Sequence, residues 1–348
     1  MKILQIMAGG AHGGAETAFI DTCLALQEAG EEIIVATRRN PRNERLNKAG
    51  IPVFVLPFGG GMDVYTPWRL TRIIRKTRPD LVQSWMGRAA AKIPADHAGV
   101  PVLSRLGNQY KMKNFARSDY FLAITPMIRD YLIANGIAPE RVRHINNFAE
   151  TELDPIPLNR ANFDTPERAP LLIALGRLHE AKAFDTLLKA LAKVPEAYLW
   201  IAGEGPDRGI LESLRNELDL KDRVRFLGWR NDRAALLKTA DLCVFPSREE
   251  AFGTVFVQAW AQRTPLIASM ADGPRQFVRD GEDGILFPID DVDSLAQAIR
   301  TALDNPSLRE NLVENGYRRY EREFTKAACV KVYQEYYHDI VQGRCSKT

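Results

Sequence analysis

Two basic side chains lie just beyond a short apolar run in the second half of the chain. The run 171–175 ends at Gly176, and Arg177 and Lys182 follow it. If the run is a strand of an open parallel sheet, its carboxyl end is where ligands bind. Two cations held there can bind a diphosphate and stabilise the negative charge that grows on it as a leaving group. The alternative is that both residues belong to an ordinary solvated loop.

An acidic segment follows another apolar run, at 242–245. Glu249 and Glu250 come shortly before Gly253, which opens a stretch with helical spacing over 253–262. A carboxylate beside helix N-terminal amides suits sugar hydroxyls, which donate to the carboxylate and accept from the amides. The alternative is that the two glutamates only complement the helix dipole.

A glycine-rich turn, GGAHGGAE over 9–16, follows the first apolar run at 2–7. Adjacent glycines let a backbone approach a ligand closely, and a helix N-terminus favours an anion; the alternative is a flexible turn. The turn does not contain GxGxxG, and the chain has no GxxxxGK[ST]. Arg38 and Arg39 could bind the phosphate of NADP, but the glycine spacing disfavours an NADP oxidoreductase.

Short apolar runs alternate with stretches of helical spacing, which predicts parallel βαβ units. The segment 149–168, with Pro155, Pro157 and Pro166, interrupts this pattern and is expected to be a linker. The alternation then restarts, and 292–341 is expected to be almost all helix, interrupted near Pro306. Strands are expected at 2–7, 32–37, 53–56, 81–83, 100–104, 120–123, 171–175, 197–202, 224–226, 242–245, 266–268 and 285–287.

The length and composition fit this two-part organisation. A chain of 348 residues with 45% hydrophobic and 26% charged residues is typical of two globular domains. The sequence has no apolar run of transmembrane length and no secretory signal pattern, so we expect a cytoplasmic location. The four cysteines have no metal-binding spacing and are expected to be unbridged thiols.

Several motifs, in order and spacing, resemble the family-4 retaining glycosyltransferases. The carriers are LGRLHEAKAFDTLLKAL at 175–191, AGEGP at 202–206, VRFLGW at 224–229, ADLCVFPSREEAFGTV at 240–255, AWAQRTPLIAS at 259–269, DGEDGILFPIDDVDSLAQAI at 280–299 and GGAE at 13–16. The resemblance implies the α/β GT-B fold, in which two Rossmann-like, doubly wound parallel-sheet domains face each other across a cleft. It also implies an acceptor-side domain at 1–160, a nucleotide-sugar donor domain at 161–324, and a helix at 325–348 that crosses back to the first domain.

The resemblance also implies roles for individual residues. Arg177 and Lys182 match the pair that binds the donor diphosphate, and Glu250 matches a carboxylate that engages sugar hydroxyls; these three form the expected catalytic set. The expected donor-binding residues are Gly13, Gly14, Gly203, Trp229, Arg230, Phe252, Gly253, Thr254 and Gln258.

Two positions depart from the family pattern. Gln258 stands where a second Glu usually accepts hydrogen bonds from the ribose, and a Gln keeps the acceptor oxygen but loses the charge. No His follows the run 101–105, where many members carry one, and Arg105 or Asn108 is expected to fill that space. His12 and Glu16 are the other candidates for the acceptor side.

The implied reaction leaves the anomeric configuration unchanged, needs no protein nucleophile and uses no cofactor or metal ion. Asp291-Val292-Asp293 spells the DxD of metal-dependent transferases, but it precedes an apolar helical stretch, so we expect Asp291 to be an N-cap.

The expected partners are a nucleotide-diphosphate sugar and a glycan or glycolipid acceptor of the lipopolysaccharide core or a similar surface glycan, and no nucleic acid. Residues 66–120 contain 11 Lys and Arg against three Asp and Glu. The helix expected at 67–78 combines part of this basic segment with Trp68, Leu70, Ile73 and Ile74. One prediction is that it contacts the anionic inner membrane, so that the enzyme is a peripheral membrane protein. The alternative is a helix that packs in the core and has a basic outer face. A sugar-nucleotide epimerase and a non-catalytic nucleotide-sugar binding protein are the alternative functions.

Overall fold

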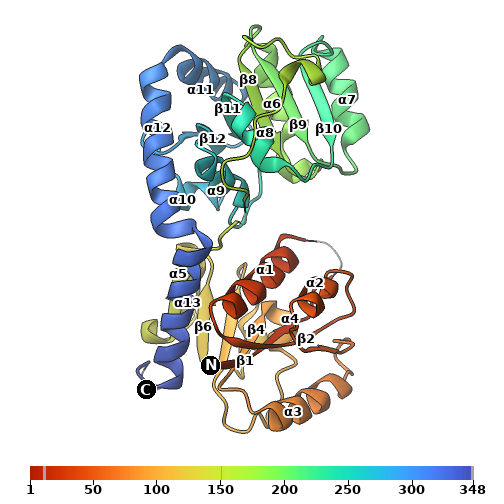
Figure 1. The fold of residues 1–348 in the computed structure, drawn as a ribbon, viewed down its shortest axis with the longest axis vertical. Coiled ribbons are helices and arrows are strands. Elements are labelled where there is room, and N and C mark those ends of the chain that lie inside the picture. Colours follow the sequence, from red (N-terminus) through yellow and green to blue (C-terminus); the bar gives the residue numbers. More distant parts are fainter. Residues whose placement is uncertain (11–12, 150, 346–348) are drawn as a thin grey trace. The chain divides into compact units, whose positions relative to one another are not determined.

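The computed structural model describes residues 1–10, 13–149 and 151–345, which divide into two compact units (Figure 1). Unit 1 contains Met1–Phe148 and the chain from Lys326 onward, and unit 2 is Ala149–Thr325. Unit 1 thus ends before the expected boundary at residue 160, because 151–160 are bonded into unit 2. Gln262 Nε2 donates to Thr151 Oγ1 over 2.8 Å, and Leu158 N donates to Thr239 Oγ1 over 2.7 Å.

In unit 1 the described residues form a seven-stranded parallel sheet in the order β3-β2-β1-β4-β5-β6-β7. Its strands are β1 (Lys2–Met7), β2 (Glu32–Thr37), β3 (Val53–Val55), β4 (Leu81–Trp85), β5 (Val102–Leu106), β6 (Tyr120–Ala123) and β7 (Val142–His144). β5 lies two residues later than expected. β7 was not expected, because three residues that include Arg and His carry little apolar signal.

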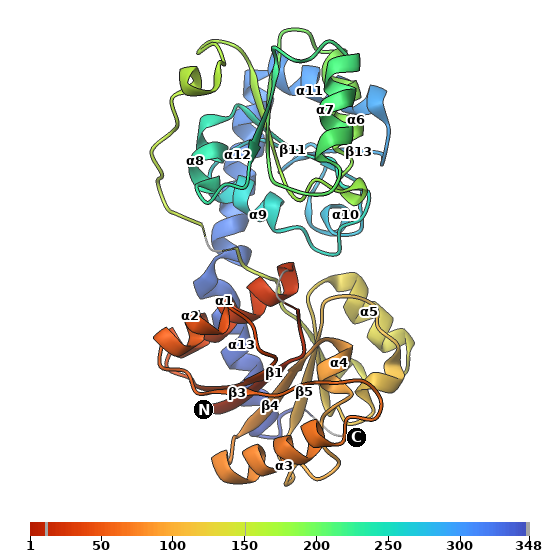
Figure 2. The same cartoon turned by 90° about the vertical axis from the view of Figure 1, so that its right-hand side faces the viewer.

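Helices cover both faces of this sheet, as Figures 1 and 2 show. Leu4 and Val82 pack with Leu70 and Ile73 of α3 on one face, while α1 and α13 cover the other. The last helix, α13, joins unit 1 through its tyrosines: Tyr336 Oη donates to Phe121 O over 3.1 Å. The helices of unit 1 are α1 (Gly14–Glu28), α2 (Asn43–Lys48), α3 (Tyr65–Thr77), α4 (Met86–Ala90), α5 (Pro126–Ala134) and α13 (Lys326–Val341).

In unit 2 the described residues form a six-stranded parallel sheet in the order β10-β9-β8-β11-β12-β13. Helices α6, α7 and α11 pack against one face, and α8 and α9 against the other. The strands are β8 (Leu171–Leu175), β9 (Tyr198–Ala202), β10 (Val224–Gly228), β11 (Leu242–Phe245), β12 (Leu266–Ser269) and β13 (Ile285–Phe287). The helices are α6 (Phe184–Ala192), α7 (Arg208–Glu217), α8 (Arg233–Thr239), α9 (Thr254–Ala261), α10 (Pro274–Phe277), α11 (Val292–Asp304) and α12 (Pro306–Arg319).

The carboxyl-terminal helical region is interrupted twice. The break at Asn305, before Pro306, confirms the expected interruption, and a π-helical turn at Tyr320–Phe324 adds a second one that the sequence did not indicate. No helix among the described ranges is both long and apolar enough to cross a bilayer.

The strand order reverses at one point in each sheet, between β1 and β4 in unit 1 and between β8 and β11 in unit 2. At such a point, the loops that follow the two neighbouring strands run in opposite directions and leave a crevice between them. In doubly wound folds, ligands bind in this crevice. The loops after β8 and β11 are the two that carry Arg177, Lys182 and Glu250.

Candidate active site

The loops after β8 and β11 are joined through their backbones in unit 2. The amides of Arg248 and Glu249 both donate to Ala181 O, over 2.9 and 3.2 Å. This joint brings the loop that carries Lys182 against the loop that carries Glu250. Two side chains 68 residues apart in the sequence thereby meet at the switch point of the sheet.

Lys182 and Glu250 form an ion pair there, with Lys182 Nζ donating to Glu250 Oε2. Both side chains are partly buried, and the ammonium also lies 5.7 Å from the centre of the Phe245 ring. A cation that can bind phosphate and a carboxylate that can bind a sugar hydroxyl are therefore in contact. The structure brings together two of the three residues expected to be catalytic.

Arg177 is the third residue of that set. Its side chain is exposed on the loop directly after β8, and within the described part of the chain its guanidinium has no hydrogen-bond or ion-pair partner. An unpaired guanidinium presents several donors in a fork that matches phosphate geometry. Arg177 is thus available for an anionic ligand, whereas Lys182 is held by Glu250.

Arg248 is a site residue that the sequence reasoning did not identify. Its guanidinium reaches Asp185 Oδ2 over 2.9 Å, Asp290 Oδ1 over 2.7 Å and the carbonyl of Glu180 over 2.7 Å. The hydrogen bond from Arg248 lowers the pKa of Asp290, and Asp185 in turn raises the pKa of Arg248. The residue lies within the SREE motif, two positions before Glu250, and that proximity was the only signal in the sequence.

The amino-terminal end of α9 is shaped by Gly253. This residue has φ 92°, which favours glycine, and a Cβ there would lie 2.7 Å from Phe245 Cε1. Phe252 is buried among Phe256, Phe277 and Phe324, so only its backbone faces the loop, while Thr254 is exposed. That the backbone amides at the amino-terminal end of α9 contact the sugar and the phosphate remains a prediction.

Gly203 directly follows β9 and lies beside the β8 loop. A Cβ at this position would lie 1.7 Å from Gly176 O, so the close approach of the two backbones requires glycine. Its amide donates to Gly228 O over 2.9 Å. This packing accounts for the glycine, and a donor contact for Gly203 stays a prediction.

The loop after β10 presents an aromatic ring. Trp229 is 65% exposed, and Arg233 lies 5.1 Å over its ring. Arg230, by contrast, is paired with its neighbour, Nε to Asp232 Oδ1 over 2.8 Å. The exposed indole is suited to stack on a nucleotide base, whereas the charge of Arg230 is already balanced.

Gln258 lines a cavity of about 180 Å³ in unit 2. The cavity is also lined by Glu152, Asn231 and Arg233, and burial lowers the pKa of Arg233. These groups offer both donors and acceptors to a polyhydroxylated ligand. Gln258 therefore faces a space in which its amide oxygen can accept a hydrogen bond.

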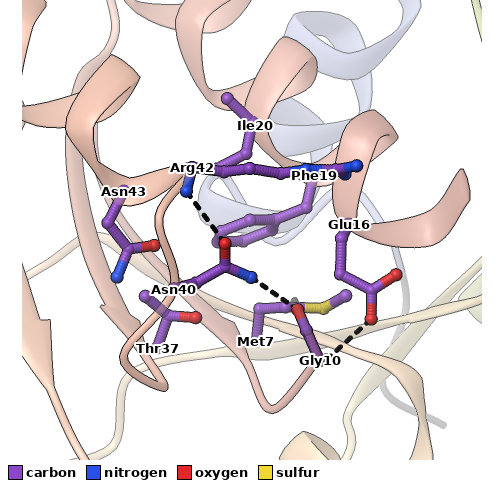
Figure 3. A pocket seen from close by; sticks show the side chains of 10 residues that line it. Met7, Gly10, Glu16, Phe19, Ile20, Thr37, Asn40, Arg42 and Asn43 are labelled. Atoms are coloured by element: carbon purple, nitrogen blue, oxygen red, sulfur yellow. Dashed lines mark hydrogen bonds between the residues drawn. The ribbon is translucent and has the colours of Figure 1, made fainter. Parts of the chain in front are cut away.

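Unit 1 has a small polar pocket at the carboxyl ends of β1 and β2, shown in Figure 3. Glu16 Oε1 accepts from Gly10 N over 2.9 Å, and Asn40 Nδ2 donates to Gly10 O over 2.5 Å. A Cβ on Gly13 would lie 2.2 Å from the Glu16 carboxylate, whereas one on Gly14 meets open space. Glu16 thus lies against Gly10 and Gly13, and its contact with an acceptor stays a prediction.

The remaining acceptor-side candidates differ in position. Arg105 is only 1% exposed: it lies 4.0 Å over the Trp85 ring and donates from Nη2 to Asn147 Oδ1 over 2.5 Å. This burial places its side chain inside unit 1, and a contact of Arg105 with the acceptor stays a prediction. Asn108 is exposed in the loop after β5, and His12 lies outside the described residues.

Two expectations about Asp and Cys residues are confirmed. Asp291 is the N-cap of α11 and accepts from Ser294 N over 2.9 Å. All four cysteines, Cys23, Cys243, Cys329 and Cys345, are free and buried.

Comparison with known proteins agrees with this architecture. Residues 12–153 match the model of Glycosyltransferase Family 4, and residues 156–319 match that of the Glycosyl transferases group 1. The fold resembles a crystal structure of Anabaena Alr3699/HepE in complex with UDP, with a TM-score of 0.87 at 22% identity over 97% of this chain and 100% of that one. The fold and the two matched domains define a glycosyltransferase of the GT-B class.

Sequence similarity extends along almost the whole chain. The lipopolysaccharide core biosynthesis glycosyltransferase LpsE of Rhizobium meliloti (strain 1021) is 33% identical over 93% of this chain and 95% of its own. LpsD of the same strain is 32% identical over 99% and 100%. The protein belongs to the family-4 glycosyltransferases, as the resemblance implied, and transferase activity replaces the epimerase, binding-protein and oxidoreductase alternatives.

Proposed function

We propose that this glycosyltransferase moves a hexose-type sugar from a nucleotide-diphosphate donor to a glycan or glycolipid of the lipopolysaccharide core or a surface polysaccharide. The reaction retains the anomeric configuration and needs no metal ion. The observation that carries the proposal is the pairing of Lys182 with Glu250 at the switch point of unit 2, with the exposed Arg177 on the same loop as Lys182. Two relatives of similar length that are glycosyltransferases of lipopolysaccharide core biosynthesis support the acceptor class.

The site residues would act by positioning and by charge stabilisation. Arg177 and Lys182 bind the two phosphates, and Glu250 accepts hydrogen bonds from the sugar hydroxyls. As the bond between the anomeric carbon and the phosphate oxygen breaks, its electron pair goes to the diphosphate, whose new charge the two cations stabilise. The acceptor oxygen attacks from the same face and its proton passes to the leaving phosphate oxygen. Asp291 caps α11, which supports the proposal that the Asp291-Val292-Asp293 sequence is not a metal site.

The proposed place of action is the cytoplasm, where nucleotide sugars are the donors, and the cytoplasmic face of the inner membrane, where a lipid-linked acceptor would be met.

The first experiment is thermal unfolding of the full chain with UDP-, GDP-, ADP- and CMP-sugars, each with and without EDTA. A ligand at a hundred times its Kd stabilises the folded state by about 2.7 kcal/mol. We expect one nucleotide class to raise the Tm equally with and without EDTA, and Arg177→Ala to abolish the rise. Arg168→Ala is the matched control, because Arg168 is an exposed arginine near the amino end of the same strand. A Tm that no nucleotide sugar changes would contradict the proposed donor site.

A further inference from the structure

Four large apolar side chains are exposed where α3 begins. Met62 is 96% exposed, Val64 79%, Tyr65 51% and Trp68 47%. Exposed apolar residues are normal when scattered, but a cluster of this kind on a soluble protein usually marks an interaction surface. The core of unit 1 does not use these side chains, because α3 packs inward through Leu70, Ile73 and Ile74.

The cluster is held in place by the backbone around it. Asp63 accepts from Thr66 N over 2.9 Å and from Gly59 N over 2.7 Å, which ties the turn to the first turn of the helix. Lys92 Nζ donates to Gly60 O over 2.7 Å and to Asp63 O over 2.9 Å. The apolar side chains are therefore presented on an ordered turn.

Basic residues continue the same outward face of α3. Trp68, Arg72, Arg75 and Lys76 are exposed at helical spacing, and the Arg72 guanidinium lies 4.0 Å over the Trp68 ring. Arg75 pairs with Asp96, whereas Arg72 and Lys76 have no acidic partner within the described ranges. The face thus passes from apolar and aromatic at the start of the helix to cationic near its end.

We propose that this surface, Met62–Trp68 together with the outward face of α3, rests on a bilayer that contains anionic lipids. Trp and Tyr are favoured at the boundary between headgroups and acyl chains, where one end of the ring is apolar and the other is wet. Adjacent cations are attracted by anionic headgroups. Exposed aromatic and apolar side chains next to cations without an acidic partner among the described residues are the combination that an anionic lipid surface binds.

The packing of α3 decides between two expectations that the sequence left open. Leu70, Ile73 and Ile74 pack in the core, so the expected stripe of the helix is not the membrane surface. The surface consists instead of the preceding turn with Trp68 and the basic residues. The functional role of this surface rests on the proposed function, in which the acceptor is lipid-linked. Binding of the surface to lipid can nevertheless be measured without any substrate.

The test is co-sedimentation of the full chain with vesicles of phosphatidylcholine alone and of phosphatidylcholine with phosphatidylglycerol in equal parts. One variant, Met62→Ser/Trp68→Ser, removes the apolar contact, and another, Arg72→Gln/Lys76→Gln, removes two cations. The matched control is Ile156→Ser/Ile210→Ser, which removes two exposed apolar side chains from unit 2. The Tm of every variant is measured to check that the variant is folded.

We expect binding to the anionic vesicles that added salt weakens. Each removed cation should weaken it about five-fold. The variant Met62→Ser/Trp68→Ser should bind the anionic vesicles more weakly than the unmodified chain, and the control should bind as the unmodified chain does. Equal binding by the two surface variants and the unmodified chain would overturn the proposal. The proposal would also be overturned if sedimentation equilibrium showed that the unmodified chain self-associates and that Met62→Ser/Trp68→Ser does not. The surface would then bind a second copy of this chain instead of a bilayer. The Tm rise with nucleotide sugar should survive in these variants, so a failed donor site would be recognised separately.

Discussion

Arg248 Nη2 lies 2.9 Å from Asp185 Oδ2, and this contact fastens the loop after β11 to the first turn of α6. The same guanidinium bonds to Asp290 and to the carbonyl of Glu180, so one side chain joins three segments. Lys182 lies between Glu180 and Asp185 in the chain, and Glu250 lies two residues after Arg248. The arginine thereby adds side-chain contacts to the backbone bonds that hold together the two loops of the Lys182–Glu250 pair.

Replacing Arg248 should therefore impair turnover without removing a group that touches the donor. In Arg248→Ala, we expect kcat, measured as nucleotide release with acceptor present, to fall about a hundredfold, because small displacements of positioned groups cost that much. KM for the donor should change much less, since Arg177 is untouched. Arg248→Lys should recover only part of the rate, because it keeps the charge but not the planar fork.

A compensating variant separates positioning from stability. Arg248→Ala removes the cation that lies between Asp185 and Asp290, and Lys189 remains as a partner of Asp185 alone, so the mutual repulsion of the two carboxylates should lower the Tm. The triple variant Arg248→Ala/Asp185→Asn/Asp290→Asn should recover the Tm and leave kcat low. Recovery of both quantities would show that Arg248 only stabilises the fold.

Acid should weaken this contact in a defined window of pH. The hydrogen bond from Arg248 lowers the pKa of Asp290 below its ordinary value of 3.8. A depressed carboxyl pKa adds stability that is fully present above the unfolded-state pKa and is lost as the pH falls through the folded-state pKa. The difference in unfolding free energy between the unmodified chain and Asp290→Asn should therefore be constant at neutral pH and vanish below 3.8. Denaturant unfolding at a series of pH values measures it, and a difference that disappears near neutrality would point to another group.

The cavity that Gln258 lines allows a test of the missing carboxylate. Gln258→Glu should tighten donor binding several-fold, because a charged acceptor forms hydrogen bonds about twice as strong as a neutral one. Gln258→Ala should weaken binding by up to about tenfold, the range for one lost neutral hydrogen bond. Isothermal titration with the nucleotide sugar from the thermal screen gives both values. Gln297→Ala, an exposed glutamine on α11, is the control; unchanged affinity in both Gln258 variants would remove this residue from the donor site.

Gly253 should not tolerate a side chain. Gly253→Ala combines an unfavourable φ of 92° with a Cβ 2.7 Å from Phe245, so we expect a loss of about 1–3 kcal/mol. The displaced Phe245 ring would also disturb Lys182, which lies over it. Gly209→Ala is the matched control: its Cβ would meet open space inside α7, and alanine is favoured there. Equal stability of the two variants would contradict this role for Gly253.

Much of the architecture could be predicted from the sequence, because a strand buried on both faces reads as an apolar run and the helices repeat between the runs. All the expected strands are present within two or three residues at their ends, and the Asp291 cap follows from local chemistry. The short β7 and the π-helical turn at Tyr320–Phe324 were missed, because tertiary packing decides segments with so little local signal.

The sequence by itself determined the order of the elements, the family and the identity of Arg177, Lys182 and Glu250 as site candidates. Only the tertiary structure decided which of them meet. Strand order brings residues 182 and 250 together through the switch point, and no local pattern encodes that distance. Tertiary packing also decided which side chains are buried or paired. Arg105 packs on Trp85 inside unit 1, and Arg248 lies between two carboxylates. Trp68 stays exposed, whereas Ile73 is buried. The reason is physical, because exposure and ion pairing depend on neighbours that are distant in the chain.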